Sequence, residues 1–223
     1  MKSLWLGIET SISRGGAALV NEDRAIGEER FSVMAVHSQV LLPGIQNLMQ
    51  RYDVRGGDIA GIAVSAGPGS YTGLRIGIAT AVGLAHGWQT GVAAVETLRI
   101  LAYAAGEGGP VLVCVRARRN EVFAACYEGH APDEEELIRP GIYTVPAVLE
   151  KVRGMGELRA VGSGVREMDL PGSVKPLPAE MDELFASAAA VLGRMKVFGY
   201  GFDSHPVPVY LRGFNERAEK SVT

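Results

Sequence analysis

A glycine-rich turn at residues 67–73 is the first place where this sequence could bind a small ligand. It lies between a short apolar run and a long segment that carries almost no charge. Free backbone N–H groups at the N-terminus of a helix bind anions such as phosphate. The letters GPGSYTG match neither G-x-G-x-x-G nor a Walker loop, since no lysine follows. Gly67, Gly69 and Ser70 therefore form either an anion site or a turn in which glycine permits close packing of strand and helix.

The histidines and acidic residues show no spacing that would form a metal centre. Two histidines at i and i+4 would lie on one helix face and could share an ion, but no such pair occurs. The acidic run DEEE at 133–136 has no spacing that would bring its carboxylates together, so we predict a solvated loop. We expect no metal and no cofactor. Each of the four histidines is interpreted as a single surface or packing residue: His37, His86, His130 and His205.

The local sequence indicates neither a nucleophile nor an RNA-binding site. Ser65 and Ser70 lie near the glycine turn, but neither is part of a G-x-S-x-G motif. We interpret both as turn or capping serines, and we predict no catalytic residue. Arg116, Arg118 and Arg119 form the one basic group, without interleaved aromatic residues. We expect a solvated hairpin tip there, and contact with transfer RNA inside an assembly stays open.

The composition is that of a globular protein with one large core or two small ones. Of the 223 residues, 47% are hydrophobic and 21% are charged, and the formal net charge is −3. This charge is too low for either half to hold nucleic acid by electrostatics alone. The first eleven residues reach Glu9 before any long apolar region develops, so we expect no secretion signal, no membrane span and a cytoplasmic location.

Hydrophobic periodicity predicts the elements that must position these residues. The glycine- and proline-containing stretch 106–110 is the predicted boundary between a first domain at 1–105 and a second at 106–223. In the first half we predict strands at 4–8, 16–20, 25–31 and 62–65 and helices at 38–52, 73–87 and 97–105. In the second half we predict strands at 111–115, 121–127, 137–143 and 160–162 and helices at 146–153 and 181–197.

Both halves therefore have the order β-β-β-α-β-α. Two copies of this order predict an α/β protein with a duplicated ribonuclease-H-like fold, the architecture of actin, sugar kinases and Hsp70. Actin-like ATPases place a phosphate-binding hairpin after the first strand, which here corresponds to Thr10, Ser11 and Ser13. Glu9 occupies the position at which many relatives of this fold carry aspartate, so the sequence gives little support for a magnesium role.

Cys114 and Cys126 flank a predicted hairpin turn at Arg119 and Asn120. A two-residue loop would point the two side chains to opposite faces of the hairpin. We expect two free thiols that act as small core residues.

The predicted helix at 73–87 is unusual because it is apolar or small on every side. One face forms a core stripe, whereas the opposite face is small and apolar, with Arg75 and His86 as the only fully polar residues between Gly73 and Gly87. Such a helix is covered either by a second protein or by a single large core around it. The core stripe comprises Leu74, Ile78, Ala81, Val82 and Ala85, and the opposite face comprises Ile76, Ala79, Thr80, Gly83 and Gly87.

Four stretches, IETS, HSQVLLPGI, GPGSYTGLRIG and PVYLR, resemble the TsaB family, which is also called YeaZ. The resemblance spans nearly all of the chain. It implies a non-catalytic partner of a TsaD-like enzyme in the threonylcarbamoylation of adenosine in transfer RNA, with a TsaE-like ATPase in the assembly and transfer RNA contacted only indirectly. Without the partner we expect a homodimer. The predicted interface comprises Arg75, Ile76, Ala79, Thr80, Gly83, His86, Leu41, Ile45 and Leu48.

The histidine pair of TsaD distinguishes this family from its catalytic relatives. The resemblance places the corresponding positions at Ala94 and Leu98, neither of which can bind a metal. Two enzyme classes stay as alternatives: a glycoprotease-like peptidase, which would need that pair, and an ATPase or sugar kinase of the same fold. The kinase would need a catalytic aspartate and a strong phosphate loop, and the sequence supplies neither.

Overall fold

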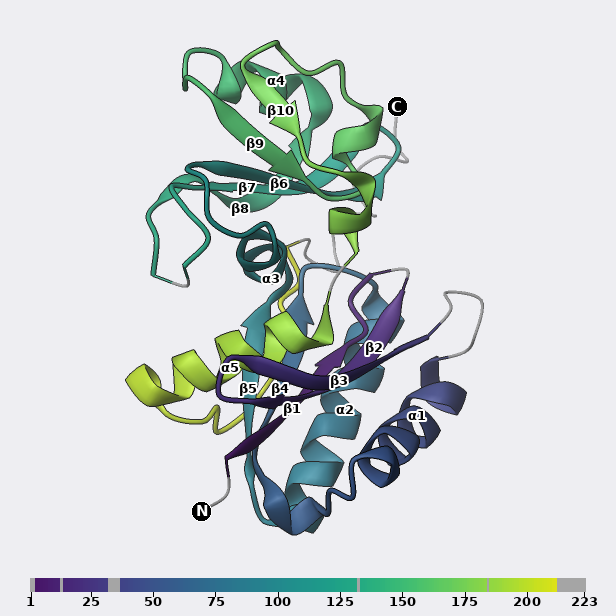
Figure 1. Cartoon of the computed structure of the whole chain (residues 1–223). Coiled ribbons are helices and arrows are strands. Elements are labelled where there is room, and N and C mark those ends of the chain that lie inside the picture. The colour runs from purple at the N-terminus through teal and green to yellow at the C-terminus, as the bar shows by residue number, and fades with distance from the viewer. Residues whose placement is uncertain (1–2, 13, 32–36, 132, 184, 212–223) are drawn as a thin grey trace, which may run out of the picture.

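The computed structural model describes residues 3–12, 14–31, 37–131, 133–183 and 185–211, which form two five-stranded sheets (Figure 1). In the first sheet the strands lie in the order β3-β2-β1-β4-β5. β1, β2 and β3 are an antiparallel meander, and β4 and β5 lie parallel to β1. The strands are β1 Leu4–Glu9, β2 Gly15–Asn21, β3 Arg24–Phe31, β4 Ile59–Gly67 and β5 Gly91–Glu96.

The second sheet repeats the topology of the first. Its order is β10-β9-β6-β7-β8, so β6 takes the central place of β1, with an antiparallel meander on one side and parallel strands on the other. The predicted duplicated ribonuclease-H-like fold is therefore confirmed. The strands are β6 Val111–Arg118, β7 Glu121–Tyr127, β8 Glu136–Thr144, β9 Leu158–Val161 and β10 Val174–Pro176.

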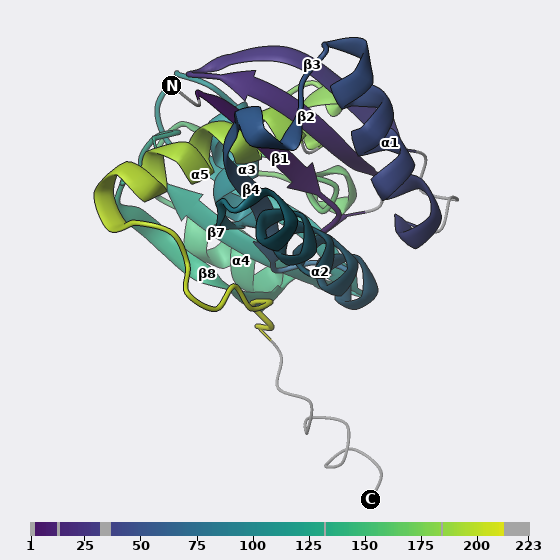
Figure 2. The ribbon, with the colours of Figure 1, turned by 90° about the horizontal axis from the view of Figure 1, so that it is seen from below.

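Helices cover both faces of the first sheet. α1 and α2 lie side by side on one face, α5 lies on the other, and α3 stands between the two sheets (Figures 1 and 2). Among the described helices, none is long and apolar enough to cross a membrane. The helices are α1 His37–Arg51, α2 Tyr71–Trp88, α3 Thr97–Ala104, α4 Val145–Val152 and α5 Ala186–Tyr200, with 3-10 turns η1 Gly56–Asp58, η2 Val165–Glu167 and η3 Ala179–Asp182.

The last helix, α5, belongs to the first sheet by its contacts. It packs across β1, β2, β4 and β5. A Cβ at Gly7 would overlap the carbonyl of Ala186, so glycine in β1 permits this close approach. The β3 residue Glu28 caps the helix, since its carboxylate accepts hydrogen bonds from Ala186 N at 2.8 Å and from Ser187 Oγ at 3.0 Å. The second half of the sequence thus completes the core of the first, and the predicted domain limits stay a prediction.

Three elements differ from the sequence-based expectation. β5 was not predicted, because GVAAVE is short, rich in alanine and directly joined to the following helix. The predicted helix at 181–197 begins later, at Ala186, because residues 179–182 form the separate turn η3 after Pro178. The short strand β10 was also not predicted.

The two cysteines are buried and free, as expected, but they lie on the same face of the hairpin. The prediction of opposite faces was wrong because the pairing register shifts by one residue between Arg116 and Arg118. Cys114 consequently pairs with Ala124 and not with Ala125, which a two-residue loop would place opposite it. Such a shift of one residue in the pairing moves the side chains of one strand to the other face relative to its partner. Both thiols contribute to the core beneath α4, and burial raises the pKa of Cys126 to about 11.

Candidate functional site

The two candidate phosphate loops lie against each other. Ser70 N donates a hydrogen bond to Ser11 O at 2.6 Å, and Thr10 Oγ1 donates to Gly73 O at 2.8 Å. A Cβ at Gly69 or Gly73 would overlap the backbone of the first loop. These contacts support the packing interpretation of the glycines, and anion binding by the two loops stays a prediction. Ser13 lies outside the described residues.

Ser70 begins α2 and is its N-cap. Its side-chain oxygen accepts a hydrogen bond from Gly73 N at 3.2 Å, as the capping interpretation expects. Gly67 ends β4 with a φ of +111°, a left-handed conformation that favours glycine. Helix capping therefore explains the serine at position 70, and the left-handed backbone explains the glycine at position 67.

Glu9 ends β1 and has no exposed surface. One of its carboxylate oxygens accepts hydrogen bonds from the Ser11 backbone N–H and hydroxyl, both at 2.5 Å. Burial raises the pKa of Glu9 from its ordinary value of 4.5 to about 7, against the opposing effect of these hydrogen bonds. A carboxyl held in this way does not face solvent, where a hydrated magnesium ion would bind.

Ala94 and Leu98, the positions that the family resemblance equates with the histidine pair of TsaD, are apolar. Leu98 is fully buried in the core between the sheets, and Ala94 is half-buried within β5. Across the described residues, no group of three or more histidine, cysteine, aspartate or glutamate side chains is arranged to hold a metal ion. His86 and the basic hairpin tip are exposed, whereas the side chain of His37 lies outside the description.

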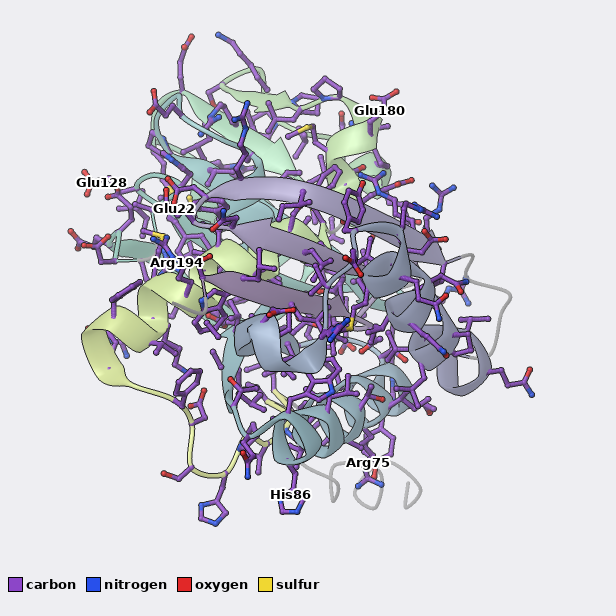
Figure 3. The ribbon with its side chains drawn as sticks, turned by 60° about the horizontal axis from the view of Figure 1, so that its bottom comes forward. Glu22, Arg75, His86, Glu128, Glu180 and Arg194 are labelled. Carbon is purple, nitrogen blue, oxygen red and sulfur yellow. The ribbon has the colours of Figure 1, made fainter. Side chains whose placement is uncertain are left out.

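Residues that the structure describes leave the outer face of α2 uncovered. Arg75, Ala79, Gly83 and His86 are exposed, and Arg75 and His86 point outward (Figure 3). Ile76, Thr80 and Leu84 are half-buried. A Cβ added to Gly83 would meet no atom within 4 Å, so the space above this face is open. The predicted core stripe is buried at Leu74, Ile78, Ala81 and Ala85, but Val82 is 43% exposed and belongs to the outer surface.

The neighbouring helix α1 does not offer the predicted interface residues to a partner. Leu41, Ile45 and Leu48 are buried in the core between α1, α2 and the first sheet, so these three side chains are not available to a partner in this structure. An apolar stripe reveals that a helix face is covered, but not what covers it. The exposed apolar residue of α1 is Leu42, at 50% exposure.

A cluster that the sequence analysis missed lies at the N-terminal end of α2. The Arg75 guanidinium lies 4.1 Å from the centre of the Tyr71 ring, and its Nε donates a hydrogen bond to the Tyr210 hydroxyl at 3.2 Å. The two tyrosine rings are 5.2 Å apart. Since Arg75 and Tyr210 are 135 residues apart, no local pattern could have joined them. The hydrogen bond to Tyr210 raises the pKa of Arg75, which stays a cation.

The basic hairpin tip is partly neutralised. Arg116 forms an ion pair with Glu167, whereas Arg118 and Arg119 are exposed. The tip lies on the second sheet, at the β6–β7 turn. A role in contacting transfer RNA stays a prediction.

Comparison with known proteins places these features in a family. Residues 32–204 match the TsaD family, described as tRNA N6-adenosine threonylcarbamoyltransferase. The Escherichia coli tRNA threonylcarbamoyladenosine biosynthesis protein TsaB is 30% identical over 222 residues, which cover 93% of this chain and 94% of that protein. The Bacillus subtilis protein of the same name is 36% identical over 125 residues, or 55% of this chain and 54% of that protein.

Solved structures agree with this assignment. A crystal structure from Pseudomonas aeruginosa, described as similar to peptidase YeaZ, has a TM-score of 0.79 at 27% identity and covers 94% of this chain and 100% of that chain. A ROK hexokinase from Thermus thermophilus, with a TM-score of 0.50 at 10% identity over 88% of this chain and 99% of that chain, shares the fold alone. Because the match to the E. coli protein runs over almost the full length of both chains, this chain belongs to the TsaB family.

Proposed function

We propose that this chain is a non-catalytic subunit that binds and activates a TsaD-like catalytic subunit in the threonylcarbamoylation of adenosine in transfer RNA. The observation that carries the proposal is the outer face of α2, which is almost uncharged and yet uncovered. Family membership supplies the process, because the relatives are named for tRNA threonylcarbamoyladenosine biosynthesis. We further propose a cytoplasmic assembly that includes a TsaE-like ATPase and in which transfer RNA contacts this chain only indirectly.

The shape of the α2 surface suits a partner helix. Ala79 and Gly83 lie one turn apart, so a neighbouring backbone can approach closely between the larger side chains of Ile76 and Val82. Exposed apolar surface of this kind marks interaction sites. In the absence of the catalytic subunit, the same face is expected to join two copies of this chain, and sedimentation at tens of micromolar would reveal the dimer.

The decisive variant is Gly83→Arg. Arginine is a better helix former than glycine by roughly 0.5–1 kcal/mol, and a Cβ at this position meets no described atom within 4 Å, so the fold should keep its stability. At an interface the same side chain would bury an unpaired charge at a cost of several kcal/mol. We expect the variant to melt near the parent temperature but to lose binding to the catalytic subunit and to support no modification in a reconstituted assay.

Gly199→Arg is the matched control, since Gly199 is also an exposed helical glycine with no atom within 4 Å of its added Cβ. It lies near the end of α5, away from α2, and should leave binding and activity unchanged. Full binding and activity of Gly83→Arg would show that the α2 face is not the interface.

The two enzyme alternatives are tested separately. The contacts between the candidate phosphate loops favour a structural role over ATP chemistry, because Thr10 and Ser70 already bond to each other's loops. Steady ATP turnover that survives further purification would favour the kinase-like alternative. Hydrolysis of a protein substrate by the pure chain would favour the peptidase alternative.

A further inference from the structure

The segment after α5, residues 202–210, forms a strap that returns from the end of that helix toward α2 (Figure 2). Its first part is fixed to the outer strand of the first sheet. Phe202 stacks on Trp5 with ring centres 5.7 Å apart and covers Gly91, where a Cβ would overlap its ring. Asp203 N donates to Val92 O at 2.9 Å, and an Asp203 carboxylate oxygen accepts from Ala94 N at 2.7 Å.

β5 is an edge strand of the first sheet. Through these two bonds Asp203 satisfies backbone groups of β5 that would otherwise need a further strand beside it. Lys196 of α5 also donates hydrogen bonds to both carboxylate oxygens of Asp203, at 2.8 and 2.9 Å. The start of the strap is therefore held by a charged pair and by backbone pairing. Its course is set before it reaches α2.

The last part of the strap lies on the glycine turn. Val209 N donates a hydrogen bond to Ala66 O at 2.6 Å, and a Cβ at Gly67 would lie 2.6 Å from Val209 O. The turn thus leaves room for the strap as well as for the first loop. The next residue, Tyr210, therefore lies beside Arg75, from which its hydroxyl accepts the hydrogen bond described above.

The result is a mixed surface at the N-terminal end of α2 made from Tyr71, Arg75 and Tyr210, here called the tyrosine–arginine site. Tyr71 and Tyr210 are 39% and 42% exposed, and Val209 beside them is 40% exposed. Within the described part of the chain, no acidic side chain forms an ion pair with Arg75. Tyrosine and arginine are the residue types that most often dominate binding energy at protein interfaces.

We propose that the strap completes the partner-binding surface: Tyr210 holds Arg75 in place, and the tyrosine–arginine site receives a carboxylate side chain from an apolar segment of the catalytic subunit. The inference rests on the proposed function, which supplies the partner. A guanidinium covered by a partner without an acidic group would be a buried, unpaired charge. The chemistry of the occupant is therefore an apolar segment that carries one aspartate or glutamate.

A second copy of this chain fits the site less well. A two-fold dimer through this surface brings the same helices together from both copies. Neither α1 nor α2 contains an aspartate or a glutamate in its sequence. Such a dimer would place Arg75 against helices that cannot neutralise it, whereas a different protein can supply the carboxylate.

The experiment measures the affinity of the purified TsaD-like subunit from the same organism for the full chain and its variants, at low and high salt. Tyr210→Phe keeps the ring and removes the hydroxyl that holds Arg75. Arg75→Gln removes the charge. We expect Arg75→Gln to weaken binding at least about tenfold and to reduce its salt dependence, and Tyr210→Phe to weaken binding by a few-fold.

Tyr200→Phe and Tyr200→Ala are the controls, because Tyr200 is an 89% exposed tyrosine at the end of α5, outside the strap. Both should bind like the parent. Tyr210→Ala, which removes the ring as well as the hydroxyl, is measured beside Tyr210→Phe. The thermal unfolding of each variant is also measured, and Tyr210→Phe carries the test if Tyr210→Ala fails to fold. A charge exchange completes the design: Arg75→Glu should abolish binding, and replacing the partner's facing carboxylate by lysine should restore it.

The outcomes separate this inference from the proposed function. If the parent binds and activates the catalytic subunit while Arg75→Gln and Tyr210→Phe bind equally well, the strap inference is wrong and the proposed function stands. If the parent does not bind that subunit, both fall. If the variants lose only self-association, or only retention of transfer RNA by the assembled complex, the occupant is a second copy or an RNA, and the inference is overturned.

Discussion

Helices α2 and α5 are both rich in small residues, yet the described residues cover the small face of α5 and leave the outer small face of α2 open. In α5, a Cβ at Gly193 would overlap Ala63 and lie 3.2 Å from the Cβ of Ala93, so the helix lies directly on the first sheet. In α2, Gly83 faces open space. Small residues therefore show that a helix has a close neighbour, but not whether the neighbour belongs to the same chain. The same substitution in both helices tests this difference.

The largest effect is expected for Gly193→Arg. Its side chain would collide with β4 and β5 and bury a charge without a partner. We expect a loss of more than about 4 kcal/mol in the free energy of unfolding, enough to abolish the fold at 37 °C. Circular dichroism of the purified variant measures this loss. A folded, stable Gly193→Arg protein would mean that α5 does not pack on the sheet as described.

Aspartate at two neighbouring positions of α2 compares its buried stripe with the edge of its exposed surface. Ile78 is 7% exposed, whereas Val82, four residues later, is 43% exposed. We expect Ile78→Asp to lose roughly 3–5 kcal/mol of stability, since a buried carboxylate has no partner there. Val82→Asp should lose less than about 1 kcal/mol and should weaken partner binding instead. Thermal unfolding together with a binding assay measures both, and equal losses of stability would contradict the assigned orientation of α2.

A pH dependence of stability is expected beneath the covered side of α2, at Glu9. Its pKa is about 7 in the folded chain and 4.5 ordinarily, so the unfolded chain releases this proton first. The resulting stabilisation is present below pH 4.5 and is lost as the pH rises through 7, a loss of about 3 kcal/mol. Urea unfolding at pH 5 and pH 8 should show a smaller difference for Glu9→Gln than for the parent.

Glu96 provides the internal control for that measurement. Burial, followed by the charge of Glu136, raises its pKa to about 7 as well. Glu96 lies at the junction of β5 and α3. The substitution Glu9→Gln should therefore leave unchanged the part of the pH dependence of stability that Glu96 contributes. If Glu9→Gln leaves the full difference between pH 5 and pH 8 unchanged, Glu9 is ionised normally in the folded chain.

The smallest effect on stability is expected for Gly83→Arg and Gly199→Arg. Both place arginine in open space on a helix, and each should change the free energy of unfolding by no more than about 1 kcal/mol, with a gain favoured by helix propensity. The two variants should differ only in partner binding, which Gly83→Arg should lose and Gly199→Arg should keep. A melting temperature well below that of the parent for Gly83→Arg would indicate that the outer face of α2 is packed in solution.

Most of the fold could be predicted because it depends on local periodicity. The meander, the glycine turn and the central helix follow from alternating or helical apolar patterns and from turn residues. The face of Cys126 could not be predicted, because it depends on a one-residue register shift at Arg116. The alanine-rich β5 was missed because its side chains are too small to show the alternation of an edge strand.

The candidate site was predicted in part. Arg75, Ala79, Gly83 and His86 of α2 are exposed, and Ile76 and Thr80 are half-buried. The three α1 residues Leu41, Ile45 and Leu48 are buried, because periodicity identifies an apolar stripe without identifying what covers it. The tyrosine–arginine site depends on a strap that returns from the far end of the sequence. A sequence pattern covers only a short window of residues, so it cannot predict a contact between residues that are 135 positions apart.

The cap that Glu28 provides for α5 has a consequence for synthesis on the ribosome. The first sheet emerges early, but the helix that covers one of its faces begins only at Ala186. At a translation rate of about 5–20 residues per second, that face stays uncovered for several seconds or more after β5 has been made. During this interval the nascent chain exposes apolar sheet surface, and we expect it to depend on chaperones until the last helix has been made.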